Sequence, residues 1–363
     1  MPTSESGEGR AFQRCGHPWT ACLCVSWSPR VPVPRLPGAE SRVAAPAWTP
    51  RAPEALPMAW SEAHLHAWLR RRIGVESATV GPRGDDAAVL RAFAGRPVLC
   101  SDQTIEGVHF EPGTPGAKIG HKAAARALSD LAATAARPAA LLLNLHASGA
   151  CSERLLRAII QAVDRTGTRF GAPLVGGDLA QASGPLALSV TALGSFPSNG
   201  RPPGRDRIRR GDVLVVTGPL GGSRLGRHLR FEPRIEEGLA LRAAGARAMM
   251  DVSDGLARDL ARMADASRVR IELDTVPVHP DARRAARGDG KEPLEHALHD
   301  GEDHELLAAF PARTFERVAP RLLRRIPRLV PIARARSGRG LWLRDESSGW
   351  KRWEGRGGYV HGE

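Results

Sequence analysis

Asp251-Val252-Ser253-Asp254-Gly255-Leu256 is the pattern of a strand end that feeds a helix. The N-terminus of such a helix presents free N–H groups and a positive dipole end to a phosphate. Asp251 and Asp254 lie on either side of the turn and could hold a metal ion there. Ser253 or Asp254 could instead cap the helix, which is an ordinary structural role. The stretch therefore predicts an α/β fold with a candidate phosphate site at a strand end.

Four further aspartates stand in short clusters of Gly, Ser and Asp at the ends of apolar runs. They are Asp85 in Gly84-Asp85-Asp86, Asp102 in Ser101-Asp102, Asp130 in Ser129-Asp130 and Asp178 in Gly176-Gly177-Asp178. Each cluster alone is ordinary turn or cap chemistry. If the carboxylates converge in the fold they repel one another, so convergence requires cations. Mg²⁺ is the natural candidate, because it takes oxygen ligands and shares itself between carboxylates and phosphates. Together the clusters favour a metal–nucleotide site built from dispersed loops.

Asp130 differs from the other aspartates because it lies inside an Ala-rich helix predicted for residues 119–137. An i,i+4 ion pair with Arg126 on an exposed face is one explanation, although this orientation of base and acid is the weaker one. A functional role is the other. Ser and Asp in mid-helix cost helix propensity, which favours the functional role.

The composition narrows the classes of protein to which this chain can belong. A chain of 363 residues with 42% hydrophobic content can form two domains with substantial cores. No apolar run has the length of a membrane span, and no signal peptide is recognisable. Five scattered cysteines are not the pattern of a disulfide scaffold, so a reducing cytoplasm is expected.

The net charge of +13 invites a nucleic-acid role, but its distribution argues against one. The basic residues are almost all arginines and are dispersed along the chain, and aromatic residues make up only 5%. Few stacking platforms for bases are therefore present. The sequence also has no Gly-Lys-Ser/Thr, which excludes a P-loop, and no protein-kinase motif set.

Residues 1–57 differ in composition from the rest. They are rich in Pro, Ser, Arg and Trp and have no helical or strand periodicity, so we expect a disordered or mis-assigned extension, with Met58 as the functional start. Cys15, His17, Cys22 and Cys24 lack the usual zinc-ligand spacing.

Downstream of Met58, helices and strands alternate. Helices are predicted at 61–72, 119–137, 152–164, 234–244 and 255–266, and strands at 98–101, 108–110, 139–145, 173–175, 186–193, 212–217 and 271–273. Residues 195–210 have the composition of a linker. We therefore predict an N-terminal domain over 58–204 and a C-terminal α/β domain over 205–363.

The clusters and their order resemble a known family. The succession is Gly84-Asp85-Asp86-Ala87-Ala88, Ser101-Asp102 with Glu106-Gly107-Val108-His109-Phe110, Ser129-Asp130-Leu131-Ala132-Ala133, Gly176-Gly177-Asp178, Asp251-Val252-Ser253-Asp254-Gly255-Leu256 and Gly301-Glu302-Asp303-His304-Glu305-Leu306. It resembles the thiamine-monophosphate kinase family of the aminoimidazole ribonucleotide synthetase superfamily. The resemblance extends from about Met58 to His361. The Glu-Gly-x-His-Phe element and the ending Gly357-Gly358-Tyr359-Val360-His361 favour this branch.

The resemblance implies a two-domain α/β (α+β) fold like that of aminoimidazole ribonucleotide synthetase. The N-terminal domain would form a barrel with its mate in a homodimer, and the C-terminal domain would contain a mixed sheet. ATP and several Mg²⁺ ions would lie in a cleft between them. The implied activity is ATP-dependent phosphorylation of thiamine monophosphate by direct in-line transfer, without a general base. No nucleic-acid or membrane partner is expected.

The resemblance also implies residue roles, carried over by motif. Metal ligands would be Asp85, Ser101, Asp102, Asp130, Asp178, Asp251 and Asp254. Contacts to ATP would come from Gly177, Asp178, Arg205 and Ser253, and contacts to thiamine monophosphate from His109, Glu302 and Tyr359.

Several positions depart from the family pattern. They are Cys100, in place of Ser or Thr beside a metal aspartate, Leu179-Ala180 in place of threonines, Asp300 and His304 around Glu302, and the ending His361-Gly362-Glu363. A thiol is a poor ligand for Mg²⁺. Two alternatives stay open at this point: another ATP-dependent synthetase of the superfamily, and a non-catalytic nucleotide-binding paralogue.

Overall fold

The computed structural model describes residues 60–72, 78–80, 87–92, 94–345, 349–355 and 357. The chain divides into two compact units, Met1–Ala52 and Pro53–Glu363, and every described residue belongs to the second. The predictions for residues 1–57, for Asp85 and for Tyr359 therefore lie outside the described residues, and nothing below tests them.

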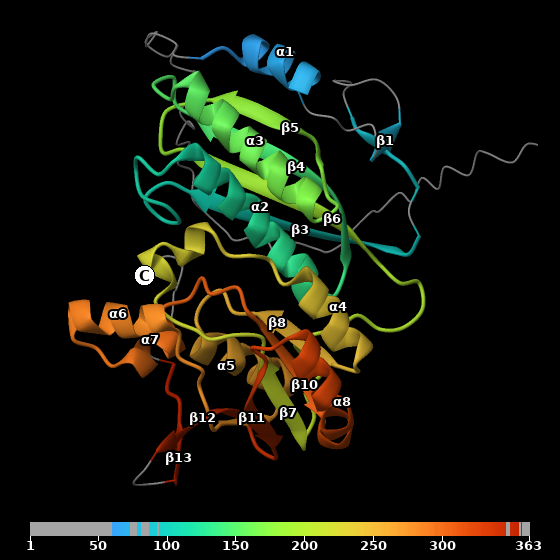
Figure 1. Cartoon of the computed structure of the whole chain (residues 1–363), viewed down its shortest axis with the longest axis vertical. Helices are drawn as coiled ribbons and strands as arrows, with labels where there is room; N and C mark the ends of the chain where they lie inside the picture. Colours follow the sequence, from blue (N-terminus) through green and yellow to red (C-terminus); the bar gives the residue numbers. More distant parts are fainter. Residues whose placement is uncertain are drawn as a thin grey trace, which may run out of the picture. The chain divides into compact units, whose positions relative to one another are not determined.

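The first half of the described chain forms a four-stranded mixed sheet in the order β3-β6-β4-β5 (Figure 1). Its strands are β3 (Arg96–Ile105), β4 (Arg137–Ala147), β5 (Leu174–Gln181) and β6 (Ala187–Phe196), and only β4 and β5 are parallel. Helices α2 (Gly116–Ala133) and α3 (Glu153–Arg169) pack on one face of it. Helix α1 (Glu62–Arg72) and the short pair β1 (Thr79–Val80) and β2 (Val89–Leu90) precede the sheet. Within the one chain this sheet is open, not closed into a barrel.

Two of the predicted elements differ in the structure. The segment 108–110 is a turn and not a strand, because Gly107 has a φ of +77° and its N–H donates to the carbonyl of Phe110. The helix predicted for 119–137 ends at Ala133, and Ala135 has a φ of +53°. Pro138 restricts the preceding residue to extended backbone, so the chain turns early and β4 begins at Arg137.

The second half forms a seven-stranded sheet in the order β13-β12-β9-β11-β7-β10-β8. The strands are β7 (Asp212–Val216), β8 (Ala248–Asp251), β9 (Arg270–Leu273), β10 (Leu306–Pro311), β11 (Val330–Arg336), β12 (Gly340–Asp345) and β13 (Gly349–Arg352). Its helices are α4 (Ile235–Ala243), α5 (Leu256–Ser267), α6 (Pro280–Asp289), α7 (Pro293–His299) and α8 (Ala312–Arg325), with 3₁₀ turns η1 (Ser223–Leu225) and η2 (Arg227–Leu229). Only β9 and β12 pair in parallel, so this half has the predicted mixed sheet.

Strand β7 explains how the two halves share one core. Successive side chains of a strand point to opposite faces. Val213 and Val215 join the core that contains α2 and the first sheet, whereas Leu214 and Val216 pack in a second core with α5. The run Val213-Leu214-Val215-Val216 is apolar throughout because both faces of the strand are covered.

Helices α2 and α4 approach each other closely where the halves meet. A Cβ atom added at Gly238 in α4 would lie 2.3 Å from the backbone oxygen of Ala132 in α2. Among the described residues, no helix is long and apolar enough to cross a membrane.

We predict that Gly238→Ala destabilises the protein. Alanine normally improves a helix interior by up to about 1 kcal/mol, but here the added methyl group meets backbone that cannot rotate away. Overpacking of this kind lowers the free energy of unfolding by about 1–3 kcal/mol, which denaturant titration measures. Gly288→Ala in α6 is the matched control, since its Cβ would meet nothing within 4 Å. A Gly238→Ala protein as stable as the control would contradict the close packing of α2 on α4.

Candidate active site

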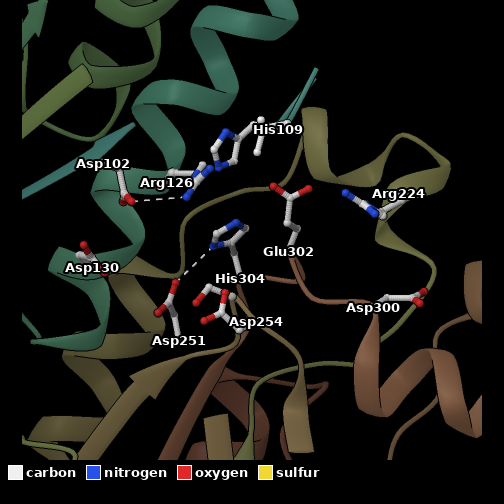
Figure 2. Close-up of a pocket in the computed structure, with 12 residues that line it drawn as sticks. Asp102, His109, Arg126, Asp130, Arg224, Asp251, Asp254, Asp300, Glu302 and His304 are labelled. Atoms are coloured by element: carbon white, nitrogen blue, oxygen red, sulfur yellow. Dashed lines mark hydrogen bonds and ion pairs between the residues drawn. The ribbon is translucent and has the colours of Figure 1, made fainter. Parts of the chain in front are cut away.

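A cavity of about 190 Å³ lies among α2, the turn after β3, and the loops next to β8 and β10 (Figure 2). The structure brings seven of the residues predicted from the sequence to its wall. They are Asp102, His109, Asp130, Asp251, Ser253, Asp254 and Glu302. These residues come from both halves of the chain, so the cavity exists only because the two sheets pack together.

One face of α2 supplies the charged groups on the first side of the cavity. Lys122, Arg126 and Asp130 are spaced four residues apart and therefore lie in a row along the helix. Arg126 and Asp130 line the cavity. Most of the remaining α2 residues are buried apolar side chains. The helix thus holds this row in a fixed position against the second half.

Asp130 is not half of an exposed helix ion pair. Nη2 of Arg126 lies 3.4 Å from Oδ1 of Asp102, and among the described residues no ion pair joins Arg126 to Asp130. Burial, with the nearby carboxylates of Asp251 and Asp102, raises the pKa of Asp130 to about 7. Three carboxylates from separate sequence clusters, those of Asp102, Asp130 and Asp251, therefore converge and repel one another.

Asp251 lies at the end of β8 and is held by two hydrogen bonds. Its Oδ2 accepts from Oγ of Ser129 at 2.8 Å and from Nδ1 of His304 at 3.2 Å. Burial alone would raise the pKa of Asp251, but these donors hold it below its usual value. The second oxygen of the carboxylate receives neither of these two bonds.

The turn between β8 and α5 is fixed by a residue that the sequence did not reveal. Oδ2 of Asp259 accepts from the backbone N–H groups of Ser253 and Asp254, each at 3.0 Å. Neither Ser253 nor Asp254 caps the helix, whose N-cap position is Gly255 and has no side-chain bond. Burial, with Asp251 and Asp254, raises the pKa of Asp259 to about 7. The capping alternative for Ser253 and Asp254 is thus wrong, and Asp254 instead pairs with Arg262 and faces the cavity.

Glu302 marks the opposite side of the cavity and is tied to α2. Its Oε1 accepts from Nζ of Lys122 at 2.7 Å, and its Oε2 lies 3.1 Å from Nδ1 of His228. Lys122 is completely buried, and burial lowers its pKa to about 8. Although burial opposes it, His228 and Lys122 hold the pKa of Glu302 below its usual range. Glu302 therefore stays ionised near neutral pH.

His109 and His304 complete the wall. Nδ1 of His109 accepts from the backbone N–H of Ile105 at 3.0 Å, which fixes the ring at the end of β3. His304 stacks on Phe231 with ring centroids 4.1 Å apart. Its backbone has a φ of +50°, an uncommon conformation for a residue with a side chain, and it directs the ring to the cavity.

Three other residues predicted for the site, Ser101, Asp178 and Arg205, do not line the cavity. Ser101 is adjacent to Asp102 but points to the open face, where its Oγ lies 3.1 Å from Oγ1 of Thr191. Asp178 is exposed on β5, at the far edge of the sheet from β3. Arg205 does not line the cavity, although its charge helps to lower the pKa of Asp130. The structure does not bring Ser101 or Asp178 to the other carboxylates, and their roles as ligands stay predictions.

Gly177 has a structural reason for being glycine. Its φ is +147°, and a Cβ there would lie 1.8 Å from the carbonyl oxygen of Leu143 on β4. The close approach that requires glycine at this position is therefore an approach to a neighbouring strand.

Cys100 lies against α2 and not in the cavity wall. Its Sγ is 3.1 Å from the carbonyl oxygen of Ala127, to which the thiol donates. Burial, together with Asp130 and Asp102, raises the pKa of Cys100 to about 12. The departure at this position therefore introduces a neutral thiol and not a metal ligand.

Sequence reasoning assigned no site role to Lys122, Arg126, Asp259 or His228. A usable signal existed for Lys122 and Arg126, because a helical period places them on the face of Asp130. Asp259 carried a weaker signal, as an acidic residue in the first turn of a helix. Nothing in the sequence around His228 indicated its place beside Glu302.

Comparison with known proteins identifies the family to which the chain belongs. The family AIR synthase related protein matches in two parts, its N-terminal domain over residues 84–196 and its C-terminal domain over residues 209–310. The chain is 38% identical over 315 residues to the thiamine-monophosphate kinase of Rhodopirellula baltica, which covers 82% of this chain and 96% of that protein. The chain belongs to the thiamine-monophosphate kinase family.

Solved structures of the thiamine-monophosphate kinase family have the same fold. The enzyme from Stenotrophomonas maltophilia is 32% identical and superposes with a TM-score of 0.65, covering 77% of this chain and 93% of that one. The structure of AaThiL complexed with AMPPCP and TMP is 28% identical, with a TM-score of 0.66 and coverage of 83% and 96%. The resemblance stated from the motifs is thereby confirmed.

The cavity suits a hard divalent cation, since its carboxylates supply oxygen ligands. Among the described residues, no three His, Cys, Asp or Glu side chains converge enough to coordinate one ion by themselves. An ion held by one or two of Asp102, Asp130, Asp251 and Asp254 would therefore complete its shell with phosphate oxygens and water, as Mg²⁺ commonly does. Burial first, and repulsion from Asp251 and Asp102 second, raise the pKa of Asp130, and a bound cation would oppose both effects.

We predict that Asp130→Asn abolishes most activity without unfolding the protein. The change keeps the shape and removes one repelling charge, so the melting temperature should stay equal or rise slightly. Turnover should fall by about 10² or more, since each 1.36 kcal/mol of lost transition-state stabilisation is about tenfold in rate. Steady-state rates and thermal melts with and without magnesium–ATP measure both effects.

Asp164→Asn in α3 is the matched control for Asp130→Asn. Oδ1 of Asp164 accepts from the backbone N–H of Leu174, and this residue does not line the cavity. The variant should retain the turnover of the folded protein, and its amide oxygen can still accept from the N–H of Leu174. Near-wild-type turnover of Asp130→Asn would remove Asp130 from the site.

We predict that Cys100 resists alkylation in the folded protein. With a pKa of about 12, only about one thiol in 10⁴ is ionised at pH 8, and the thiolate is the reactive form. Labelling by iodoacetamide, followed by peptide mass spectrometry, should be slow at pH 8, accelerate as the pH rises, and become fast in denaturant. Rapid labelling of Cys100 at pH 8 would contradict its burial against α2.

Proposed function

We propose that the protein transfers the γ-phosphoryl group of ATP to thiamine monophosphate, giving thiamine diphosphate and ADP. The observation that carries this proposal is the acidic cavity with the guanidinium of Arg126 on its wall, in a chain that matches 96% of the length of a thiamine-monophosphate kinase. The complex of a relative with AMPPCP, an ATP analogue, and TMP supports the pair of substrates.

The reaction requires no strong general base. A phosphate oxygen of thiamine monophosphate, already anionic near neutral pH, attacks the γ-phosphorus in line. The bond from the γ-phosphorus to the oxygen bridging it to the β-phosphorus breaks, and ADP leaves with the electron pair. The main difficulty is the repulsion between two anions, so catalysis here consists of positioning and charge neutralisation.

We propose several Mg²⁺ ions as the cations, each bound by one or two of Asp102, Asp130, Asp251 and Asp254. Mg²⁺ bound there would neutralise phosphate charge and orient the phosphate oxygens. Ser253 lines the cavity at the N-terminal end of α5 and is placed to contact the nucleotide phosphates. Roles for Asp85, Ser101, Asp178, Gly177 and Arg205 are part of the same proposal, carried by the family resemblance alone.

The substrate end of the site is proposed to be the side with His109, Glu302 and Tyr359. The carboxylate of Glu302 stays ionised because His228 and Lys122 lower its pKa. An ionised carboxylate at this position suits a cationic ring such as the thiazolium of thiamine. His109 lies on the same wall, and Tyr359 would pack against a thiamine ring.

We also propose a homodimer through the open face of the four-stranded sheet. This face exposes large apolar side chains, with Leu99 68% and Leu142 41% accessible. A second copy packed there would cover them and complete the barrel that the family resemblance implies. A cytoplasmic location is proposed because Cys100 and Cys151 are free thiols, as expected in a reducing compartment.

One assay tests the proposed function directly. Purified protein is incubated with ATP, Mg²⁺ and thiamine monophosphate, and the products are separated by chromatography. We expect equimolar thiamine diphosphate and ADP, and no ADP above background when thiamine monophosphate or Mg²⁺ is omitted. Formation of ADP without thiamine diphosphate would point to another synthetase of the superfamily, and absence of both products would point to a non-catalytic paralogue.

A further inference from the structure

Arg126 presents unused hydrogen-bond donors to the cavity. Its Nη2 is only 3.4 Å from Oδ1 of Asp102, near the limit for a hydrogen bond. Its Nε and Nη1 are shielded from solvent and have no hydrogen-bond partner in the described part of the chain. Buried donors are almost always satisfied, so an exception needs a cause.

A second unpaired atom lies on the same wall. Nε2 of His304 is also buried and has no partner within the described residues, while Nδ1 of the same ring is used by Asp251. Figure 2 shows the guanidinium of Arg126 and the ring of His304 facing each other across the cavity, between Asp102 and Glu302. Unpaired atoms from α2 and from the loop before β10 therefore face one space, which indicates the position of an absent ligand.

The chemistry of that ligand follows from the donors. A guanidinium is permanently protonated and offers a rigid fork of N–H groups that matches an oxyanion such as a phosphate. An isolated anion would be repelled by Asp102, Asp130 and Asp251, so the anion arrives together with divalent cations. A metal-bound polyphosphate meets both conditions.

We propose that Arg126 binds the transferring γ-phosphoryl group and stabilises its charge during the reaction. The inference rests on the proposed function and adds to it a residue that is neither a metal ligand nor a contact to thiamine. Arg126 donates hydrogen bonds to the γ-oxygens while the bond to the bridging oxygen breaks and the bond to the acceptor phosphate forms. Arg126 gives up no proton, so the bonds that form and break in the phosphoryl transfer are the same with or without it.

The neighbours of Arg126 identify the γ-phosphoryl group as the one it binds. Asp102 and Asp130, the proposed metal ligands, lie beside it, and phosphates bridged by Mg²⁺ would lie there too. Glu302, at the proposed thiamine end, is already paired with Lys122. The group that reaches Arg126 is therefore the one between the nucleotide metals and the acceptor.

The test compares AMPPCP with ADP, each with Mg²⁺, by calorimetry on the full chain. In Arg126→Gln we expect AMPPCP affinity to fall at least about tenfold relative to ADP affinity, because only AMPPCP carries the third phosphoryl group. Loss of one transition-state donor costs about 10²–10³ in kcat, and the KM for thiamine monophosphate should change little. Arg126→Lys, which keeps the charge but not the fork, should recover part of kcat.

The control is Arg157→Gln on α3, whose guanidinium pairs with Glu153 on its own helix. Both ligand affinities and kcat should be unchanged in it. Equal losses of AMPPCP and ADP affinity in Arg126→Gln would overturn the proposal and leave Arg126 as a structural partner of Asp102. A fall in thiamine monophosphate affinity alone would overturn it as well.

The calorimetric binding measurement distinguishes a failure of the role of Arg126 from a failure of the proposed function. If the wild-type protein forms no thiamine diphosphate, the proposed function fails. The difference between its affinities for AMPPCP and ADP, compared with that of Arg126→Gln, still shows whether Arg126 binds the third phosphoryl group. If the wild-type protein is active and Arg126→Gln and Arg126→Lys both keep full kcat and full discrimination, only the role of Arg126 fails.

Discussion

The shape of the candidate site depends on the burial of helix α2, which carries charged side chains. Helix α2 is covered by the first sheet, by α3 and by the second half of the chain, so the ammonium group of Lys122 has no access to water. A buried charge left without a partner costs about 3–5 kcal/mol. Glu302, 180 residues away, supplies that partner together with His228. The ion pair therefore fixes the second half of the chain against α2 and, with it, the shape of the cavity.

The same packing forces carboxylates together. Asp102, Asp130 and Asp251 come from β3, α2 and β8, and each would be solvated and separate in an unfolded chain. In the folded protein their burial and their mutual repulsion raise the pKa of Asp130. This arrangement costs stability, as the arrangement of an active site often does. Cations and phosphates together can relieve it, because the cations neutralise the carboxylates and Arg126 offers donors to the phosphates.

The backbone between Gly301 and His304 makes a further contribution. Glu302 and His304 both have φ near +50°, which costs about 1–3 kcal/mol for residues with side chains. Their N–H groups donate to the carbonyls of Ser253 and Val252, at 2.7 and 2.8 Å. Those backbone bonds hold the strained segment against the end of β8, and both side chains consequently line the cavity.

The sequence by itself determined the local features of this protein. The alternation of strands and helices, the turn at Asp251–Gly255 and the position of Asp251 at the end of a strand follow from residues within a few positions of one another. The order of the clusters was specific enough to indicate the family before any contact was known. Even the separation of Ser101 from Asp102 was accessible, since adjacent strand residues point to opposite faces.

Only the tertiary structure decided which charges meet. Arg126 pairs with Asp102 on β3 and not with Asp130 on its own helix, and Lys122 pairs with Glu302. Asp178 points to the open face because its neighbour Leu179 is buried on the other one, and β5 lies at the edge of the sheet farthest from β3. The physical reason is the separation along the chain over which each kind of interaction acts. Helix and strand propensities act over about four residues, whereas these pairings join residues 24 and 180 positions apart and exist only once two sheets bury α2 between them.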